Sequence, residues 1–147
     1  EQFLPRLVKE LSKYLIQFRV YKRCIDIMPT ATEATEQDWS QEYLGPVMSV
    51  RVVQSLEEAI EHINQYSSRH TEAIVTDRVD VAQKFTREID SSAVMVNAST
   101  RFNDGSQLGM GAEIGISTDK FHARGPCGLK ELTTYKYIVQ GNGHVRS

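Results

Sequence analysis

The N-terminal segment carries apolar side chains at the three- and four-residue steps of an α-helix. These positions are Phe3, Leu4, Leu7, Val8, Leu11, Tyr14, Leu15 and Phe18. The pattern predicts an amphipathic helix over Phe3–Phe18 that packs on another part of the fold. A short strand is expected near Val20–Cys24, and Pro29 then opens a polar stretch, Thr30–Asp38, whose lack of any period is typical of a surface loop.

The middle of the chain alternates short apolar runs with helical patterns. The runs Val47–Val53, Ala73–Thr76 and Ala93–Asn97 are predicted to be strands. The first helix between them is expected to be capped by Ser55, with Glu58 reaching back to the backbone. The second is expected to be capped by Asp77. Its predicted buried face consists of Val81, Ala82, Phe85 and Ile89. Because parallel neighbours need a crossover connection, this alternation predicts an α/β fold with a parallel sheet and flanking helices.

Beyond Asn97 the chain loses both helical and strand periods. Glycines punctuate this part at positions 105, 109, 111, 115, 125 and 128. Interleaved apolar residues such as Leu108 and Ile114 argue against disorder, so the pattern favours a long, ordered loop with a functional role. Near the end, Thr133–Gln140 alternates β-branched and aromatic residues with polar ones, which predicts a terminal strand. Such a strand pairs within its own chain or adds to a neighbour's sheet.

The charges are nearly balanced and evenly spread. The 147 residues, about one domain, include 17 Lys+Arg and 19 Asp+Glu, without a basic stripe. Nucleic acid is therefore not an expected partner. No apolar run is long enough to span a bilayer and no signal peptide is visible, so we expect no membrane partner and a cytoplasmic location. The chain begins without Met and inside a helical pattern, which we interpret as the sign of a fragment.

The potential metal ligands show no site-like spacing. Cys24 and Cys127 are far apart and form no CxxC pair, and the four histidines are scattered. We therefore expect neither a metal site nor a disulfide, and we assign neither cysteine a catalytic role.

Several blocks resemble one known family over nearly the whole chain. They are Val53–Ile74 (VQSLEEAIEHINQYSSRHTEAI), Val96–Gly105 (VNASTRFNDG), Gly111–Thr118 (GAEIGIST), His122–Pro126 (HARGP) and Leu132–Lys136 (LTTYK). These blocks are similar to the γ-glutamyl phosphate reductase family, within the aldehyde dehydrogenase superfamily. A further block, Glu42–Pro46 (EYLGP), is similar to the superfamily's Glu-x-Phe-Gly-Pro motif.

The resemblance implies a fold, a reaction and an assembly. Residues 1–122 would form the distal part of the catalytic α/β domain, and residues 123–147 a return segment with a C-terminal oligomerisation strand. The implied reaction is the NADPH-dependent reduction of γ-glutamyl phosphate to glutamate 5-semialdehyde and phosphate in proline biosynthesis, by a cytoplasmic homo-oligomer. In the family the nucleophilic cysteine lies upstream of this region, so we expect no catalytic residue here and no activity from this fragment alone.

The resemblance also places the cofactor-binding residues. In the motif the glutamate holds the nicotinamide ribose hydroxyls, which assigns that role to Glu42 because a carboxylate accepts two hydrogen bonds from a vicinal diol. Leu44 replaces the motif's aromatic residue and would offer apolar contact to the nicotinamide without ring stacking. The alternative for Glu42 is a solvated loop carboxylate. The preference for NADPH over NADH follows from the family alone.

The substrate carries a carboxylate, an ammonium and a phosphate, so its pocket needs fixed charges of both signs. The candidate substrate-binding residues are Asn97, Ser99, Arg101, Asp104, His122 and Arg124. Arg101 would bind the carboxylate or phosphate and Asp104 the ammonium, unless the two pair with each other at the surface. For Asn97 and His122 the alternatives are a turn-forming and a structural role.

Two other functions remain open from the sequence. The chain is either part of the reductase or a stable, non-catalytic assembly module. The parent is either a single reductase or the reductase half of a bifunctional pyrroline-5-carboxylate synthase. A general aldehyde dehydrogenase is disfavoured, because the blocks around His70, Ser99 and His122 resemble those of the reductase.

Overall fold

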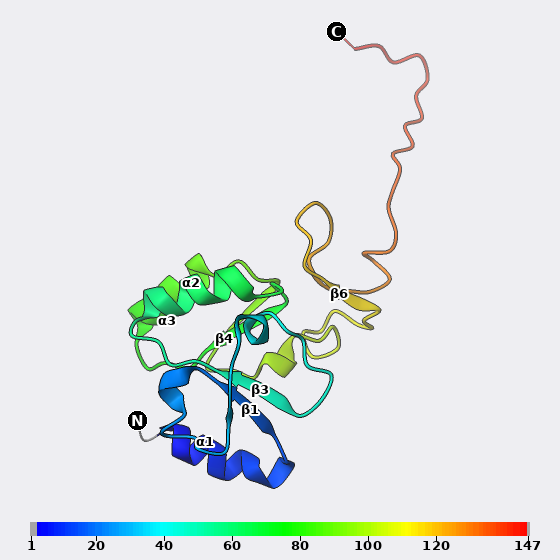
Figure 1. Cartoon of the computed structure of the whole chain (residues 1–147). Helices are drawn as coiled ribbons and strands as arrows, with labels where there is room; N and C mark the ends of the chain where they lie inside the picture. Colours follow the sequence, from blue (N-terminus) through cyan, green and yellow to red (C-terminus); the bar gives the residue numbers. More distant parts are fainter. Residues whose placement is uncertain (1–2, 147) are drawn as a thin grey trace. The chain divides into compact units, whose positions relative to one another are not determined.

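The structure is a computed structural model that describes residues 3–146 of the chain (Figure 1). The chain divides into two compact units. The first unit holds the residues up to Arg69 together with Thr76–Asp90, and the second holds His70–Val75 together with the residues from Ser91 onward. Each unit is described by itself.

The first unit contains a small parallel sheet and three helices. Its elements are α1 (Phe3–Leu11), β1 (Gln17–Val20), β2 (Thr32–Glu33), β3 (Val47–Val50), α2 (Leu56–Tyr66) and α3 (Val79–Glu88), with 3₁₀ turns at Ser12–Tyr14, Lys22–Cys24 and Glu36–Trp39. The strand order is β2-β1-β3 and both pairings are parallel. Gln17 lies opposite Val47 and Val20 opposite Val50. The α/β fold with a parallel sheet, predicted from the sequence, is confirmed in this unit.

The N-terminal helix is shorter than the apolar pattern predicts. It ends at Leu11, and Leu15 turns the chain with a left-handed φ of 54°. The backbone N–H of Gln17 then donates to the carbonyl of Pro46 at 2.8 Å, so the following residues enter the sheet. The predicted strand near Val20–Cys24 is misplaced for the same reason. The strand ends at Val20, and a 3₁₀ turn occupies Lys22–Cys24.

The core of the first unit forms around β1. Phe18 and Val20 are buried on one face of the strand and pack with Cys24 and Met28, each of which is only 1% exposed. Leu4, Val8 and Leu11 of α1 pack against this cluster, which explains the apolar stripe of that helix. Cys24 is therefore a core residue.

Helix α2 begins at its predicted cap. The Ser55 side chain accepts from the backbone N–H of Glu58 at 3.1 Å. The Glu58 carboxylate reaches the N–H of Gln54, one residue earlier than a standard capping box, at 2.8 Å. Helices α2 and α3 lie side by side (Figure 1), joined by an ion pair between Glu57 and Lys84.

The predicted cap of α3 is wrong. The residue at the cap position is Arg78, whose backbone is extended and whose side chain makes no cap hydrogen bond, so Asp77 lies one residue too early. The Arg78 guanidinium instead pairs with Asp80 in the first turn at 2.5 Å. The predicted buried face is confirmed at Phe85 and Ile89, and is only half-buried at Val81 and Ala82.

The second unit contains two separate strand pairs. Strands β4 (Thr71–Ile74) and β5 (Ala93–Val96) pair in parallel, whereas β6 (Gly115–Ser117) and β7 (Gly125–Cys127) pair antiparallel. A 3₁₀ turn at Thr100–Phe102 follows β5. The two predicted strands of this region are confirmed, each ending one or two residues earlier than predicted.

The C-terminal segment forms no strand with the rest of the chain. Within the described residues, 133–140 pair with no strand, and Figure 1 shows them as extended chain beyond β6 and β7. The predicted terminal strand is therefore not formed within this chain. The apolar and aromatic side chains of this segment stay exposed because no other described residue covers them. Among the described residues, no helix is long and apolar enough to cross a membrane.

Candidate functional site

The first candidate region is a hollow of about 520 Å³ in the first unit. It lies where the chain leaves the 3₁₀ turn Glu36–Trp39 and approaches β3. Its lining residues are Thr35, Gln37, Asp38, Gln41, Glu42, Tyr43 and Leu44. Both residues predicted to bind the cofactor are thus part of one hollow. Asp38 and Tyr43, which the sequence analysis did not select, line it with them.

Glu42 and Leu44 present their side chains to solvent. Leu44 is 97% exposed, and no described residue donates a hydrogen bond to the carboxylate of Glu42. The carbonyl of Glu42 accepts from Nε2 of Gln41 at 2.9 Å. The pair therefore offers two free carboxylate oxygens beside an apolar side chain.

Asp38 and Tyr43 make a hydrogen-bonded support for this hollow. The hydroxyl of Tyr43 donates to Oδ1 of Asp38, while the N–H and the hydroxyl of Thr35 donate to Oδ2 at 2.7 and 2.8 Å. Donation by Tyr43 is the main reason that the pKa of Asp38 lies below its usual value. Burial and the bond to Asp38 raise the pKa of Tyr43. Both effects keep the phenol protonated and the carboxylate charged at neutral pH.

This arrangement fits one edge of a nicotinamide nucleotide. A ribose diol has two O–H donors, and the free oxygens of Glu42 can accept both. Leu44 is almost fully exposed, and the flat nicotinamide ring would cover its apolar surface. The described residues of the hollow supply no cation for a phosphate group, so the fit concerns the nicotinamide riboside alone.

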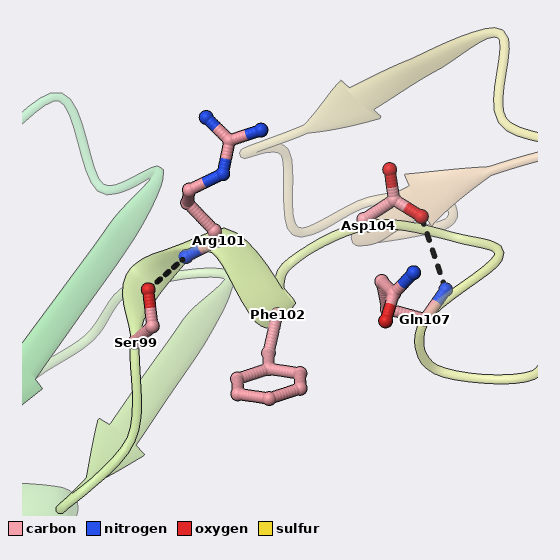
Figure 2. A pocket seen from close by; sticks show the side chains of 5 residues that line it. All are labelled: Ser99, Arg101, Phe102, Asp104 and Gln107. Carbon is pink, nitrogen blue, oxygen red and sulfur yellow. Dashed lines mark hydrogen bonds between the residues drawn. The ribbon is translucent and has the colours of Figure 1, made fainter.

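The second candidate region is a hollow of about 330 Å³ in the second unit. Ser99, Arg101, Phe102, Asp104 and Gln107 line it (Figure 2). The 3₁₀ turn after β5 positions them, because Oγ of Ser99 accepts from the backbone N–H of Arg101 at 3.2 Å. Three of the predicted substrate-binding residues thus come together in one place. Phe102 and Gln107 were not selected, although Phe102 lies within the block that carries the resemblance.

Asp104 uses one carboxylate oxygen to build its own loop. Oδ1 accepts from the backbone N–H and the hydroxyl of Ser106 at 2.8 and 2.6 Å, and from the N–H of Gln107 at 3.0 Å. These bonds, the Ser106 hydroxyl foremost, lower the pKa of Asp104 and keep it charged. No described residue donates to Oδ2, which leaves it available to a ligand.

Arg101 and Asp104 do not form the surface ion pair that the sequence left open. Among residues 3–146, none of the ion pairs joins these two side chains, and Figure 2 shows them apart, with no hydrogen bond between them. The guanidinium also donates no hydrogen bond to a described residue. A cation and an anion are therefore both available to a ligand in one hollow.

A buried asparagine holds this loop in place. Asn103 is 7% exposed, and its Nδ2 donates to Oγ1 of Thr71, at the start of β4, at 2.8 Å. Its hydrogen-bond partner Thr71 lies 32 residues earlier in the sequence, so no local sequence pattern could reveal the contact. Asn103 therefore fixes the positions of its neighbours Phe102 and Asp104.

The three other predicted substrate residues lie outside this hollow's lining. Asn97 has a left-handed φ of 53°, and its N–H extends the ladder of β5 by donating to the carbonyl of Ile74 at 2.9 Å. The ring Nε2 of His122 lies 3.2 Å from the carbonyl of Glu131. Arg124 is half-buried just before β7. Their contact with substrate stays a prediction.

Two glycines of this unit have packing reasons. A Cβ on Gly128 would lie 2.5 Å from the carbonyl oxygen of Ala112, which is backbone and cannot easily move. A Cβ on Gly105 would lie 3.1 Å from Cβ of Glu113, whose carboxylate accepts from the Gly105 N–H at 2.9 Å. Close approach of loop segments, which only glycine allows, therefore shapes the region beside the hollow.

The remaining titratable groups suggest no further centre. Within the described residues, no group of three or more His, Cys, Asp or Glu side chains could hold a metal ion. Cys127 is half-buried, and its thiol donates to the carbonyl of Gly125 at 3.3 Å.

The chain is similar to proteins of known name over nearly its whole length. The chain is 58% identical over 143 residues to a γ-glutamyl phosphate reductase of Rhodopirellula baltica, covering 97% of this chain and 33% of that protein. It is 54% identical over 146 residues to one of Caldanaerobacter subterraneus, covering 99% of this chain and 35% of that protein. A crystal structure of γ-glutamyl phosphate reductase from Thermotoga maritima superposes with a TM-score of 0.90 at 54% identity, over 99% of this chain and 35% of that one.

These matches leave the chain about a third as long as the relatives it resembles. The model of the aldehyde dehydrogenase family matches residues 27–138, which include both hollows. The chain therefore belongs to the aldehyde dehydrogenase family, and this membership implies a nicotinamide cofactor.

Proposed function

We propose that this chain is the distal part of an NADPH-dependent γ-glutamyl phosphate reductase of proline biosynthesis. In that reaction the bond between the acyl carbon and phosphate breaks, and a hydride from NADPH is added to the acyl carbon. The products are glutamate 5-semialdehyde, phosphate and NADP⁺. The observation that carries the proposal is the similarity of 97–99% of this chain to γ-glutamyl phosphate reductases, at 53–58% identity and with a TM-score of 0.90.

The first hollow would hold the nicotinamide riboside of the cofactor. The cofactor supplies the hydride. Glu42 would accept hydrogen bonds from the two ribose hydroxyls, and Leu44 would cover the nicotinamide with apolar surface. The choice of NADPH over NADH follows from the resemblance to the reductase family.

The second hollow would bind the glutamyl part of the substrate. The planar guanidinium of Arg101 matches a carboxylate or a phosphate, and Oδ2 of Asp104 can accept from the substrate ammonium. The Ser99 hydroxyl already accepts from the backbone of Arg101, so its own proton can be donated to an anionic ligand. We also propose substrate contacts for Asn97, His122 and Arg124.

The organisation of the parent protein is part of the same proposal. Residues 1–122 would belong to its catalytic domain, and residues 123–147 would form a return segment and an oligomerisation strand. Tyr137 and Val139 of that segment are 84% and 91% exposed, which supports pairing with a second copy in a homo-oligomer. As a biosynthetic enzyme, the parent is proposed to be cytoplasmic.

The test is an assay of the full-length parent in the reverse direction. Glutamate 5-semialdehyde and NADP⁺ should yield NADPH only when inorganic phosphate is present. In this direction phosphate bonds to the acyl carbon, and the product is γ-glutamyl phosphate. A general aldehyde dehydrogenase would need no phosphate, so NADPH formation without it would refute the proposal. An aldehyde of the same length without the carboxylate and ammonium is the matched control, and it should react far more slowly.

A further inference from the structure

The loop that carries Glu42 has little backbone support. Its ends are fixed, by Gln41 N–H donating to Gln37 at 3.0 Å and by Gln17 N–H donating to Pro46 at 2.8 Å. Between these ends, among the described residues, no hydrogen bond joins the backbone of residues 42–44 to any other backbone group. The position of the Glu42 carboxylate therefore depends on a side chain that anchors this stretch.

Besides the exposed Gln41, whose Nε2 donates to the carbonyl of Glu42, Tyr43 is such a side chain, and its anchor is held firmly. Its hydroxyl donates to Asp38, whose side chain is 16% exposed. The hydroxyl of Ser49, in β3, donates to the carbonyl of Asp38 at 2.9 Å. Nε of Arg19, in β1, lies 3.9 Å from the Asp38 carboxylate. Through Asp38, the Tyr43 side chain is thus tied to two strands of the parallel sheet.

We propose that Tyr43, through its bond to Asp38, is a positioning residue that holds Glu42 and Leu44 in place for the nicotinamide riboside. This inference rests on the proposed function of Glu42. Tyr43 lies between the two contact residues, so fixing its side chain orients the peptide groups on both sides. The two neighbours then face solvent with their ligand-binding groups unpaired.

The charge states make this bond persistent. The carboxylate of Asp38 stays ionised at neutral pH because several donors lower its pKa. Tyr43 keeps its proton because its pKa is raised. A bond between a neutral donor and an ionised acceptor is stronger than one between two neutral groups, so the loop is fixed before the cofactor arrives.

The experiment uses the full-length parent and measures the equilibrium Kd of NADP⁺ by titration calorimetry. Glu42→Gln should weaken binding, and Tyr43→Phe, which removes only the hydroxyl, should raise the Kd about tenfold. Adding Tyr43→Phe to Glu42→Gln should cause a smaller loss than Tyr43→Phe causes alone, because the contribution of Tyr43 through Glu42 is already gone and only that through Leu44 remains. The KM for glutamate 5-semialdehyde should stay unchanged in Tyr43→Phe.

The matched control is Tyr66→Phe. The Tyr66 hydroxyl also donates to a carboxylate, that of Glu36, but Tyr66 lies in α2 outside the hollow. Its removal should leave the Kd unchanged, whereas a general effect of lost tyrosine–carboxylate bonds would raise it. If Tyr43→Phe does not fold, Ser49→Ala replaces it, since it removes a donor to Asp38 and should weaken binding in the same non-additive way.

The outcomes separate this inference from the function beneath it. A normal Kd for Glu42→Gln would overturn the proposed role of Glu42 and, with it, the positioning role of Tyr43. Two outcomes would overturn the positioning role alone, both with a raised Kd of NADP⁺ for Glu42→Gln. One is a normal Kd for Tyr43→Phe, and the other is fully additive losses of binding free energy in the double variant. Only the non-additive result supports it.

Discussion

Arg101→Ala tests the assignment of the substrate hollow most directly. The Arg101 guanidinium has no ion-pair or hydrogen-bond partner among the described residues, so its whole donor set is available to a ligand. Charge-assisted hydrogen bonds of this kind contribute about 1.5–3 kcal/mol. Because the side chain is exposed, solvent screening favours the lower end, about 1.5–2 kcal/mol, which corresponds to a roughly ten- to thirtyfold higher KM.

The assay measures the KM for glutamate 5-semialdehyde in the full-length parent. Arg101→Lys keeps the charge but loses the planar fork, so its KM should rise less, by about fivefold. The matched control is Arg78→Ala, which removes another exposed arginine, one that pairs with Asp80 outside both hollows. A wild-type KM for Arg101→Ala, in protein with an unchanged urea midpoint, would refute the reasoning.

Two further predictions concern stability of the parent in urea. Gly128→Ala places a Cβ 2.5 Å from the carbonyl oxygen of Ala112 and should lower the free energy of unfolding by about 1–3 kcal/mol. Gly115→Ala, with open space around its Cβ, is the control and should change the free energy of unfolding little. Equal urea midpoints for the two variants would contradict the packing argument. The bond and charge of Lys84 lower the pKa of Glu57 from 4.5 to about 2. A lowered pKa stabilises the fold above the unfolded value, so the difference between wild type and Glu57→Gln should be present above about pH 5 and vanish towards about pH 2. Exposed Glu61→Gln is its control, and a difference that persists at low pH would exclude the ion pair as its source.

The predictable parts of the fold were those that local sequence determines. The Ser55 cap needs only the backbone three residues on, so it was found correctly. The end of α1 could not be predicted in this way. The backbone of Gln17 pairs with Pro46, so residues whose apolar spacing is helical form a strand instead. The alternation in residues 133–140 has strand character but finds no partner strand among the described residues, so the predicted pairing within this chain is wrong and pairing with a second copy stays a prediction.

The candidate site divides in the same way. Ser99, Arg101 and Asp104 are close in sequence on one turn, so their common hollow was within reach of a local argument. Asn103 was missed because its partner Thr71 is remote. Tyr43 occupies the variable position of its motif, so the motif gives it no role. The spacing Thr35-x-x-Asp38, a capping pattern just upstream, nevertheless indicates that this loop is ordered.

The two hollows share one physical design. In each, an aspartate, Asp38 or Asp104, accepts several hydrogen bonds from its own loop. Each loop is also tied to a parallel strand, by Ser49 in the first unit and by Asn103 bound to Thr71 in the second. Because these bonds satisfy the supporting groups, the neighbouring side chains Glu42 and Arg101 need no protein partner and keep their full hydrogen-bonding capacity for a ligand. Rigid support beside unpaired charge is what a pre-organised binding site requires, since ordering the loop then costs no binding free energy.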